Sequence, residues 1–148
     1  MKIHSCTDEY FMKQALAEAR AAASEGEVPV GAIVTCRDRI IARAHNRTES
    51  LHDPTAHAEM LAITAATEML GAKYLTECTL YVTVEPCTMC AGAIGWAQTG
   101  TLVYGASDDK RGFRRYAPET LHPKTIVKQD VLENECATLM KDFFRERR

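Results

Sequence analysis

Hydrophobic and polar positions follow a helical period in some parts of the chain and a strand pattern in others. Apolar residues from Phe11 to Ala22 recur every three or four positions, which predicts a helix over 7–25. The run Thr-Leu-Tyr-Val-Thr-Val at 79–84 predicts a strand, which Pro86 ends. The same reasoning predicts further strands at 30–35, 39–44, 101–106 and 125–129, and further helices at 56–70, 88–97 and 131–147.

The order of these elements predicts one α/β domain over residues 1–148. Strands that alternate with helices favour a sheet covered on both faces. The strand–helix–strand unit at 79–106 predicts a parallel crossover, whereas the short link at 36–38 predicts an antiparallel hairpin. We therefore expect a mixed sheet. The polar stretch at 107–123 is assigned no regular element.

Composition places the chain among ordinary globular proteins and excludes several other classes. Hydrophobic residues make up 46% and charged residues 26%, with a formal net charge of −2, which excludes disordered, collagen-like and coiled-coil chains. No apolar run reaches the roughly 18–20 residues that a membrane span needs, and the first ten residues do not resemble a signal peptide. We expect a cytoplasmic protein without a membrane partner. A near-neutral chain needs a local basic patch to bind nucleic acid.

Candidate chemistry is concentrated in two short fragments. Cys87 and Cys90 follow Pro86, and their three-residue spacing places both thiols on one face of a first helical turn. His57 opens the preceding predicted helix. Two Cys and one His suit Zn²⁺, and three protein ligands leave a position for water, as in catalytic sites. The alternative is a structural site with a fourth ligand, for which the candidates are His45, His52 and His122; the remaining cysteines, Cys6, Cys36, Cys78 and Cys136, are predicted to be free thiols.

Glu59, two residues after His57, would lie beside such a metal. A carboxylate there can carry a proton from water to substrate; the alternative is that Glu59 only favours the helix N-terminus. The segment 110–115 carries four positive charges in six residues, with Phe113 and Tyr116 available to stack on bases. The alternative for this segment is a solvated loop.

Four motifs extend the zinc signature into a resemblance that covers nearly the whole chain. They are Gly-Glu-Val-Pro-Val-Gly-Ala at 26–32, His-Asp-Pro-Thr-Ala-His-Ala-Glu at 52–59, the strand and cysteine segment at 80–93, and Asp-Phe-Phe-Arg at 142–145. Together they resemble bacterial tRNA adenosine deaminases, within the zinc-dependent cytidine/deoxycytidylate deaminase superfamily. The resemblance implies a three-layer α/β/α cytidine-deaminase-like fold with a five-stranded mixed sheet. It also implies a homodimer, one Zn²⁺ per subunit, and hydrolytic deamination of the wobble adenosine to inosine in a tRNA anticodon loop.

The resemblance also assigns roles to individual residues. It implies that the metal ligands are His57, Cys87 and Cys90 and that Glu59 is the proton shuttle. Asn46 would hydrogen-bond the flipped adenosine, and the backbone at Ala58 would read the base edge. The resemblance also implies RNA contacts at Asp108, Phe144 and Arg147, although Phe144 is equally suited to the core. The basic segment described above adds Lys110, Arg111 and Phe113 as predicted RNA contacts, independently of the resemblance.

Two segments depart from the tRNA deaminase pattern, and one of them, at 111–123, is shorter than in some members of the family. Gly-Trp-Ala-Gln-Thr at 95–99 replaces a His-Ser-Arg-like run, and its Trp-Ala pair is similar to guanine deaminases. The second hypothesis is therefore a deaminase of free guanine or of another small base or nucleoside. A third is a non-catalytic subunit that binds zinc and RNA, against which the intact Glu59 argues.

Overall fold

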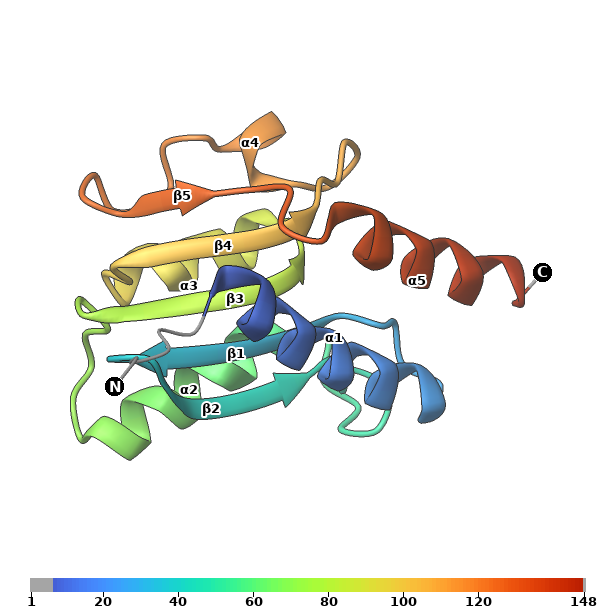
Figure 1. Ribbon diagram of the computed structural model, residues 1–148, viewed down its shortest axis with the longest axis horizontal. Helices are drawn as coiled ribbons and strands as arrows, with labels where there is room; N and C mark the ends of the chain where they lie inside the picture. Colours follow the sequence, from blue (N-terminus) through green and yellow to red (C-terminus); the bar gives the residue numbers. More distant parts are fainter. Residues whose placement is uncertain (1–6, 148) are drawn as a thin grey trace, which may run out of the picture.

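Five strands form one mixed sheet in the computed structural model, which describes residues 7–147 (Figure 1). The spatial order is β2-β1-β3-β4-β5, and the strands are β1 (Gly31–Cys36), β2 (Arg39–His45), β3 (Cys78–Val84), β4 (Thr101–Ala106) and β5 (Ile126–Lys128). β1 is antiparallel to both β2 and β3, whereas β3, β4 and β5 are parallel. The predicted hairpin, parallel crossover and mixed sheet are confirmed.

Helices cover both faces of this sheet, as Figure 1 shows, and complete three layers. On one face lie α1 (Asp8–Ser24) and α5 (Glu133–Arg145), and on the other lie α2 (Ala58–Leu70) and α3 (Thr88–Trp96). Each face has its own buried cluster. The first includes Phe11, Met12, Ile33, Tyr81, Val103 and Cys136, and the second includes Val34, Ala62, Leu80, Ile94 and Leu102.

The hairpin and the close helix–sheet contact have local causes. Arg37 and Asp38 have φ values of 54° and 62°, the left-handed pair of a tight two-residue turn between β1 and β2. Gly31 opens β1 where α1 crosses it, and a Cβ built on Gly31 would lie 2.0 Å from the carbonyl oxygen of Ala15. The absence of a side chain at Gly31 therefore allows α1 to pack directly on the strand.

The strand directions bring several segments to one edge of the sheet. β3 and β4 end there, at Val84 and Ala106, and the antiparallel β1 begins there, at Gly31. Segments that follow or precede these strand ends therefore converge. This edge is where open α/β sheets place ligands.

The remaining differences from expectation are small. The polar stretch contains a short helix, α4 (Phe113–Tyr116), which the sequence pattern did not predict. Cys6 lies outside the described residues, and Cys36 and Cys78 are register partners on neighbouring strands. None of the helices within residues 7–147 is long and apolar enough to span a membrane.

Candidate active site

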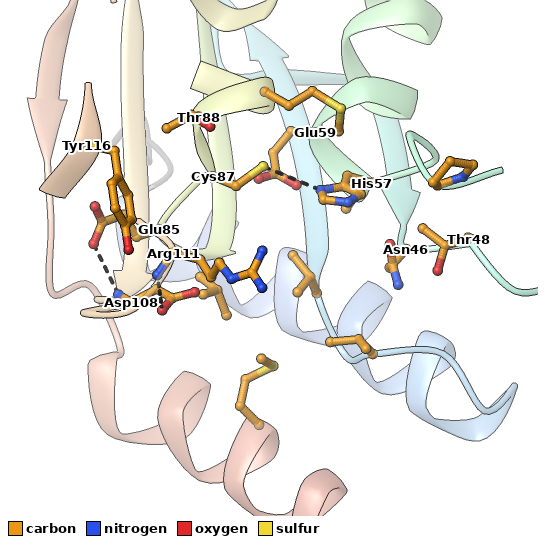
Figure 2. A pocket seen from close by; sticks show the side chains of 17 residues that line it. Asn46, Thr48, His57, Glu59, Glu85, Cys87, Thr88, Asp108, Arg111 and Tyr116 are labelled. Atoms are coloured by element: carbon orange, nitrogen blue, oxygen red, sulfur yellow. Dashed lines mark hydrogen bonds between the residues drawn. The ribbon is translucent and has the colours of Figure 1, made fainter. Parts of the chain in front are cut away.

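Two helix N-termini meet at this edge of the sheet. His57 is the residue before α2 and Cys87 is the residue before α3, and both have extended backbones with ψ of 153° and 174°. The helix at 56–70 was predicted to start two residues earlier, but the extended His57 delays it. As a result, the imidazole and the thiol point past the ends of their helices toward one another (Figure 2).

His57, Cys87 and Cys90 form a group whose geometry suits a tetrahedral metal. Nδ1 of His57 lies 3.7 Å from Sγ of Cys87 and 3.5 Å from Sγ of Cys90. A tetrahedral Zn²⁺ with ordinary bond lengths separates its sulfur and nitrogen ligands by about 3.6 Å. The observed spacings match that value, so these three residues fit Zn²⁺ as a ligand set.

The group has three members within the described part of the chain. No further His, Cys, Asp or Glu of residues 7–147 joins the set close enough to share an ion. Two of the proposed fourth ligands have other partners: His45 contacts Glu18 and Glu25, and Nδ1 of His122 accepts from the backbone N–H of Lys124. The arrangement therefore favours an open coordination position over a closed structural site.

The donor set is ready to bind a cation. The hydrogen bond from Cys90, together with one from His57, lowers the pKa of Cys87 to about 4. The Cys87 thiolate in turn raises the pKa of Cys90 and that of His57. One thiolate therefore already exists near neutral pH, and a metal would displace the proton that the Cys90 thiol holds.

Glu59 lies in the first turn of α2 and is only 4% exposed. Burial raises the pKa of Glu59 to about 7, and the negative charge of Cys87 acts in the same direction. Figure 2 shows its carboxylate next to Cys87 and His57, at the wall of the same pocket. A carboxyl group that titrates near neutrality can both accept and donate a proton.

His57, Glu59 and Cys87 line a cavity of about 820 Å³. Four of the predicted substrate or RNA contacts also line it, namely Asn46, Ala58, Asp108 and Arg111. Asn46 is only 7% exposed, and Figure 2 places its amide on the same side of the pocket as His57. Asp108 and Arg111 lie on the opposite side. The cavity is large enough for a nucleoside and open enough to be part of a longer binding surface.

The other predicted RNA contacts lie elsewhere. Phe113 is 3% exposed and packs edge-on against Tyr104, with ring centroids 6.5 Å apart, so its interpretation as a base-stacking residue is wrong. Its burial anchors α4 to the core instead. Phe144 is 49% exposed, while the neighbouring Phe143 is buried under the guanidinium of Arg147. Lys110 is exposed on the loop beside the cavity.

Three further residues at the site received no role from the sequence: Thr48 and two buried carboxylates, Glu27 and Glu85. Thr48 and Glu85 line the cavity, as does Tyr116, which was expected to stack on bases, and Glu27 directly precedes the lining residue Val28. Glu27 accepts the backbone N–H groups of Glu49 and Ser50 at 3.0 and 2.8 Å. Both carboxylates belong to the motifs at 26–32 and 80–93. The sequence signal for both residues was an acidic side chain next to an apolar strand. Such a residue is expected to be buried and therefore to need hydrogen-bonding partners.

Comparisons with known proteins agree with this geometry. Residues 6–148 match the family model of MafB19-like deaminases. A tRNA-specific adenosine deaminase of Agrobacterium fabrum is 46% identical over 144 residues, covering 94% of this chain and 95% of the relative. The chain belongs to the family of the tRNA-specific adenosine deaminases.

Two solved structures, one of a tRNA deaminase and one of a guanine deaminase, are similar to this chain in fold. A structure from a study of A-to-I editing by tRNA:A34 deaminases has a TM-score of 0.83 and 44% identity, covering 88% of this chain and 98% of that one. A guanine deaminase from Nitrosomonas europaea has a TM-score of 0.80 but 25% identity, covering 96% of this chain and 86% of that one. The predicted cytidine-deaminase-like fold is thus confirmed, and this guanine deaminase is the more distant of the two.

Proposed function

We propose that this protein catalyses the hydrolytic deamination of the wobble adenosine to inosine in a tRNA anticodon loop. The observation that carries the proposal is one cavity lined by two members of the three-residue metal group, His57 and Cys87, and by a buried carboxyl group, Glu59. The names of the A. fabrum relative and of the A34 deaminase structure support adenosine in tRNA as the substrate. Because tRNA of the cytoplasm is the expected substrate, a cytoplasmic location belongs to the same proposal.

The metal group and Glu59 divide the chemistry between them. Zn²⁺ held by His57, Cys87 and Cys90, one per subunit, would supply activation of a water molecule as the nucleophile. Glu59 takes a proton from that water and delivers it to the adenine ring nitrogen next to the carbon under attack. It then helps ammonia to leave. The apolar surroundings that raise the pKa of Glu59 suit it to both steps.

Residues on the two sides of the cavity orient the base and the RNA. Asn46 can hydrogen-bond the nucleoside, and the backbone at Ala58 can pair with the base edge. Asp108 and Arg111 face them across the cavity and can contact the flanking nucleotides. Lys110 is exposed beside Arg111 and can contact the RNA backbone, and the exposed Phe144 and Arg147 are further candidate contacts near the C-terminus. Target bases in an anticodon loop are already unpaired, so extrusion costs little.

The guanine hypothesis loses its main sequence support in this fold. Trp96 is 85% exposed at the end of α3 and lines a separate hollow with Tyr74 and Ile63. The Trp-Ala pair therefore does not contact the substrate cavity within one chain. We propose instead that this apolar surface on α2 and α3 contributes to a homodimer, because exposed aromatic side chains favour association. Light scattering of wild type and of Trp96→Ala tests this assignment.

Substrate choice is tested directly with the zinc-loaded protein. An anticodon stem-loop with a wobble adenosine is incubated with the protein beside free guanine, cytidine and adenosine, and ammonia release is measured. Inosine formed only in the RNA supports the proposal. Turnover of a free base with the RNA untouched would show that the substrate assignment is wrong, and metal and RNA binding without any ammonia would point to a non-catalytic subunit.

A further inference from the structure

Glu85 connects the segment that carries Cys87 to the opposite side of the cavity. It follows β3 directly and is two residues before the ligand Cys87, yet it is only 5% exposed. Its Oε1 accepts the backbone N–H of Asp108 at 3.0 Å, and its Oε2 accepts the backbone N–H of Arg114 at 3.1 Å. The guanidinium of Arg114 also donates to Oε1, at 3.3 Å. This one carboxylate therefore holds both ends of a loop.

That loop carries one side of the substrate cavity. Residues 108–116, which we call the 108–116 wall, contribute Asp108, Arg111 and Tyr116 to the cavity lining. The backbone of the wall also contacts Pro86 and Cys87. The N–H of Phe113 donates to the carbonyl of Pro86 at 2.9 Å, and Gly112 pairs with Cys87 as an isolated β-bridge. A shift of the wall would therefore change the width of the cavity at the metal ligand itself.

Gly112 shows how tightly the wall is seated on Glu85. A Cβ built on Gly112 would lie 2.3 Å from both Cδ and Oε2 of Glu85. Real side-chain contacts do not reach such a distance, so the glycine allows the backbone to rest directly on the carboxylate. No space remains between Gly112 and Glu85 for a larger or repositioned side chain.

The ionic character of Glu85 matters because a buried charge is costly unless it is fully paired. Two backbone N–H groups and one guanidinium meet it here, an arrangement of charge-assisted hydrogen bonds. Arg114 is held in turn by Gln129, whose Oε1 accepts from its Nη1 at 2.7 Å. An uncharged amide in place of the carboxylate keeps the shape but turns an N–H group toward one of these donors.

We propose that Glu85 is a positioning residue that sets the distance between the metal ligand Cys87 and the 108–116 wall, and so controls binding of the RNA substrate. This proposal rests on the proposed function, because it takes the RNA substrate from there. Glu85 itself touches no reacting atom in this scheme. It acts through Asp108, Arg111 and Tyr116, which meet the nucleotides around the target base.

Glu85→Gln tests this role, with Glu119→Gln as a control that removes the same charge from an exposed site on the next loop. We expect Glu85→Gln to keep one zinc per chain and to raise KM for the anticodon stem-loop at least about tenfold, because charged hydrogen bonds of this kind are lost. The single-turnover rate at saturating RNA should stay within about threefold of wild type. A variant that only folds less well would show a lower kcat at unchanged KM.

Amide hydrogen exchange measures how often the backbone of the 108–116 wall opens, and it does not depend on the deamination reaction. Faster exchange confined to the 108–116 wall in Glu85→Gln supports the proposal; unchanged exchange with unchanged KM overturns it, and faster exchange throughout the chain would overturn it in favour of a purely structural role. Gly112→Ala and Arg114→Gln disturb the same contact with Glu85 intact, and keep the test available if Glu85→Gln does not fold. Wild-type protein that releases no ammonia would refute the proposed function, while the exchange result would still decide the role of Glu85.

Discussion

Nδ1 of His57 lies 3.5 Å from Sγ of Cys90, although the two residues are 33 positions apart and belong to the N-terminal ends of different helices. The contact exists because β3 runs antiparallel to β1 and brings the start of α3 to the same sheet edge as the start of α2. Positive helix ends at both positions favour thiolate over thiol. The fold thus brings the three residues of the candidate metal group together from the starts of two separate helices.

Removal of one predicted ligand should weaken metal binding strongly. We expect His57→Ala and Cys87→Ser to weaken zinc affinity by more than about 100-fold, which is the upper range for loss of a partner that only orients a ligand. Zinc content after dialysis, measured by mass spectrometry, checks this. Cys36→Ser is the control, because Cys36 lies at the far end of β1 from the site. Full zinc content in either ligand variant would show that the ligand set is wrong.

Glu59→Gln should separate metal binding from catalysis. The variant keeps the shape of the side chain but cannot accept and return a proton, so we expect kcat to fall by about 10²–10⁴-fold. Its zinc content should equal that of wild type, since Glu59 is outside the ligand group. Glu9→Gln, an exposed change in the first turn of α1, serves as the control. Near-normal turnover in metal-replete Glu59→Gln would refute the proton-shuttle role.

Local patterns were sufficient to predict most of the fold. The β-branched run of β3 and the amphipathic period of α1 are strong signals that depend on neighbouring residues only. The helix α4 was missed because it has four residues and rests on the burial of Phe113 against Tyr104, a contact between distant segments. The same contact explains why an aromatic residue among arginines was wrongly assigned to RNA.

The same distinction between local patterns and contacts between distant segments applies to the site. Cys87 and Cys90 are close in sequence, so their spacing alone indicates a ligand pair. The role of Glu85 depends on a loop that folds back across 23 positions to reach it, which no local pattern encodes. The contacts Asp108, Arg111 and Tyr116 were expected, but no local pattern shows that they share one wall held by Glu85. Chemistry carried by short spacings was predictable, whereas the way this wall is held was not.

Stability should depend on pH through His45. Burial lowers the pKa of His45, but its contacts with Glu18 at 3.0 Å and Glu25 at 3.1 Å outweigh burial and raise the pKa above its ordinary 6.5. Arg43 shares Glu18 with it. Because the folded protein favours the protonated form, this contribution is fully present below the ordinary value and is lost as pH rises through the folded-state pKa.

His45→Gln tests this linkage by urea unfolding at about pH 5.5 and about pH 8. The variant should be less stable than wild type by about 1 kcal/mol or less at the lower pH, since Glu25 is exposed to solvent. The difference should shrink at the higher pH. His52→Gln controls for loss of an exposed imidazole. A wild-type advantage that grows with pH would contradict the sign of the argument.

Gly31→Ala should destabilise the fold more than its small size suggests. The added Cβ would lie 2.0 Å from the carbonyl oxygen of Ala15 and 2.5 Å from the backbone nitrogen of Ala19, and neither backbone atom can move without displacing α1. We expect the free energy of unfolding to fall by about 3 kcal/mol or more, the upper range for overpacking. Gly71→Ala is the matched comparison, because nothing lies within 4 Å of its added Cβ and only the φ of 65° opposes it. That change should cost about 1 kcal/mol. Equal losses for the two variants in urea unfolding would show that α1 can shift away from β1, and that Gly31 does not set their separation.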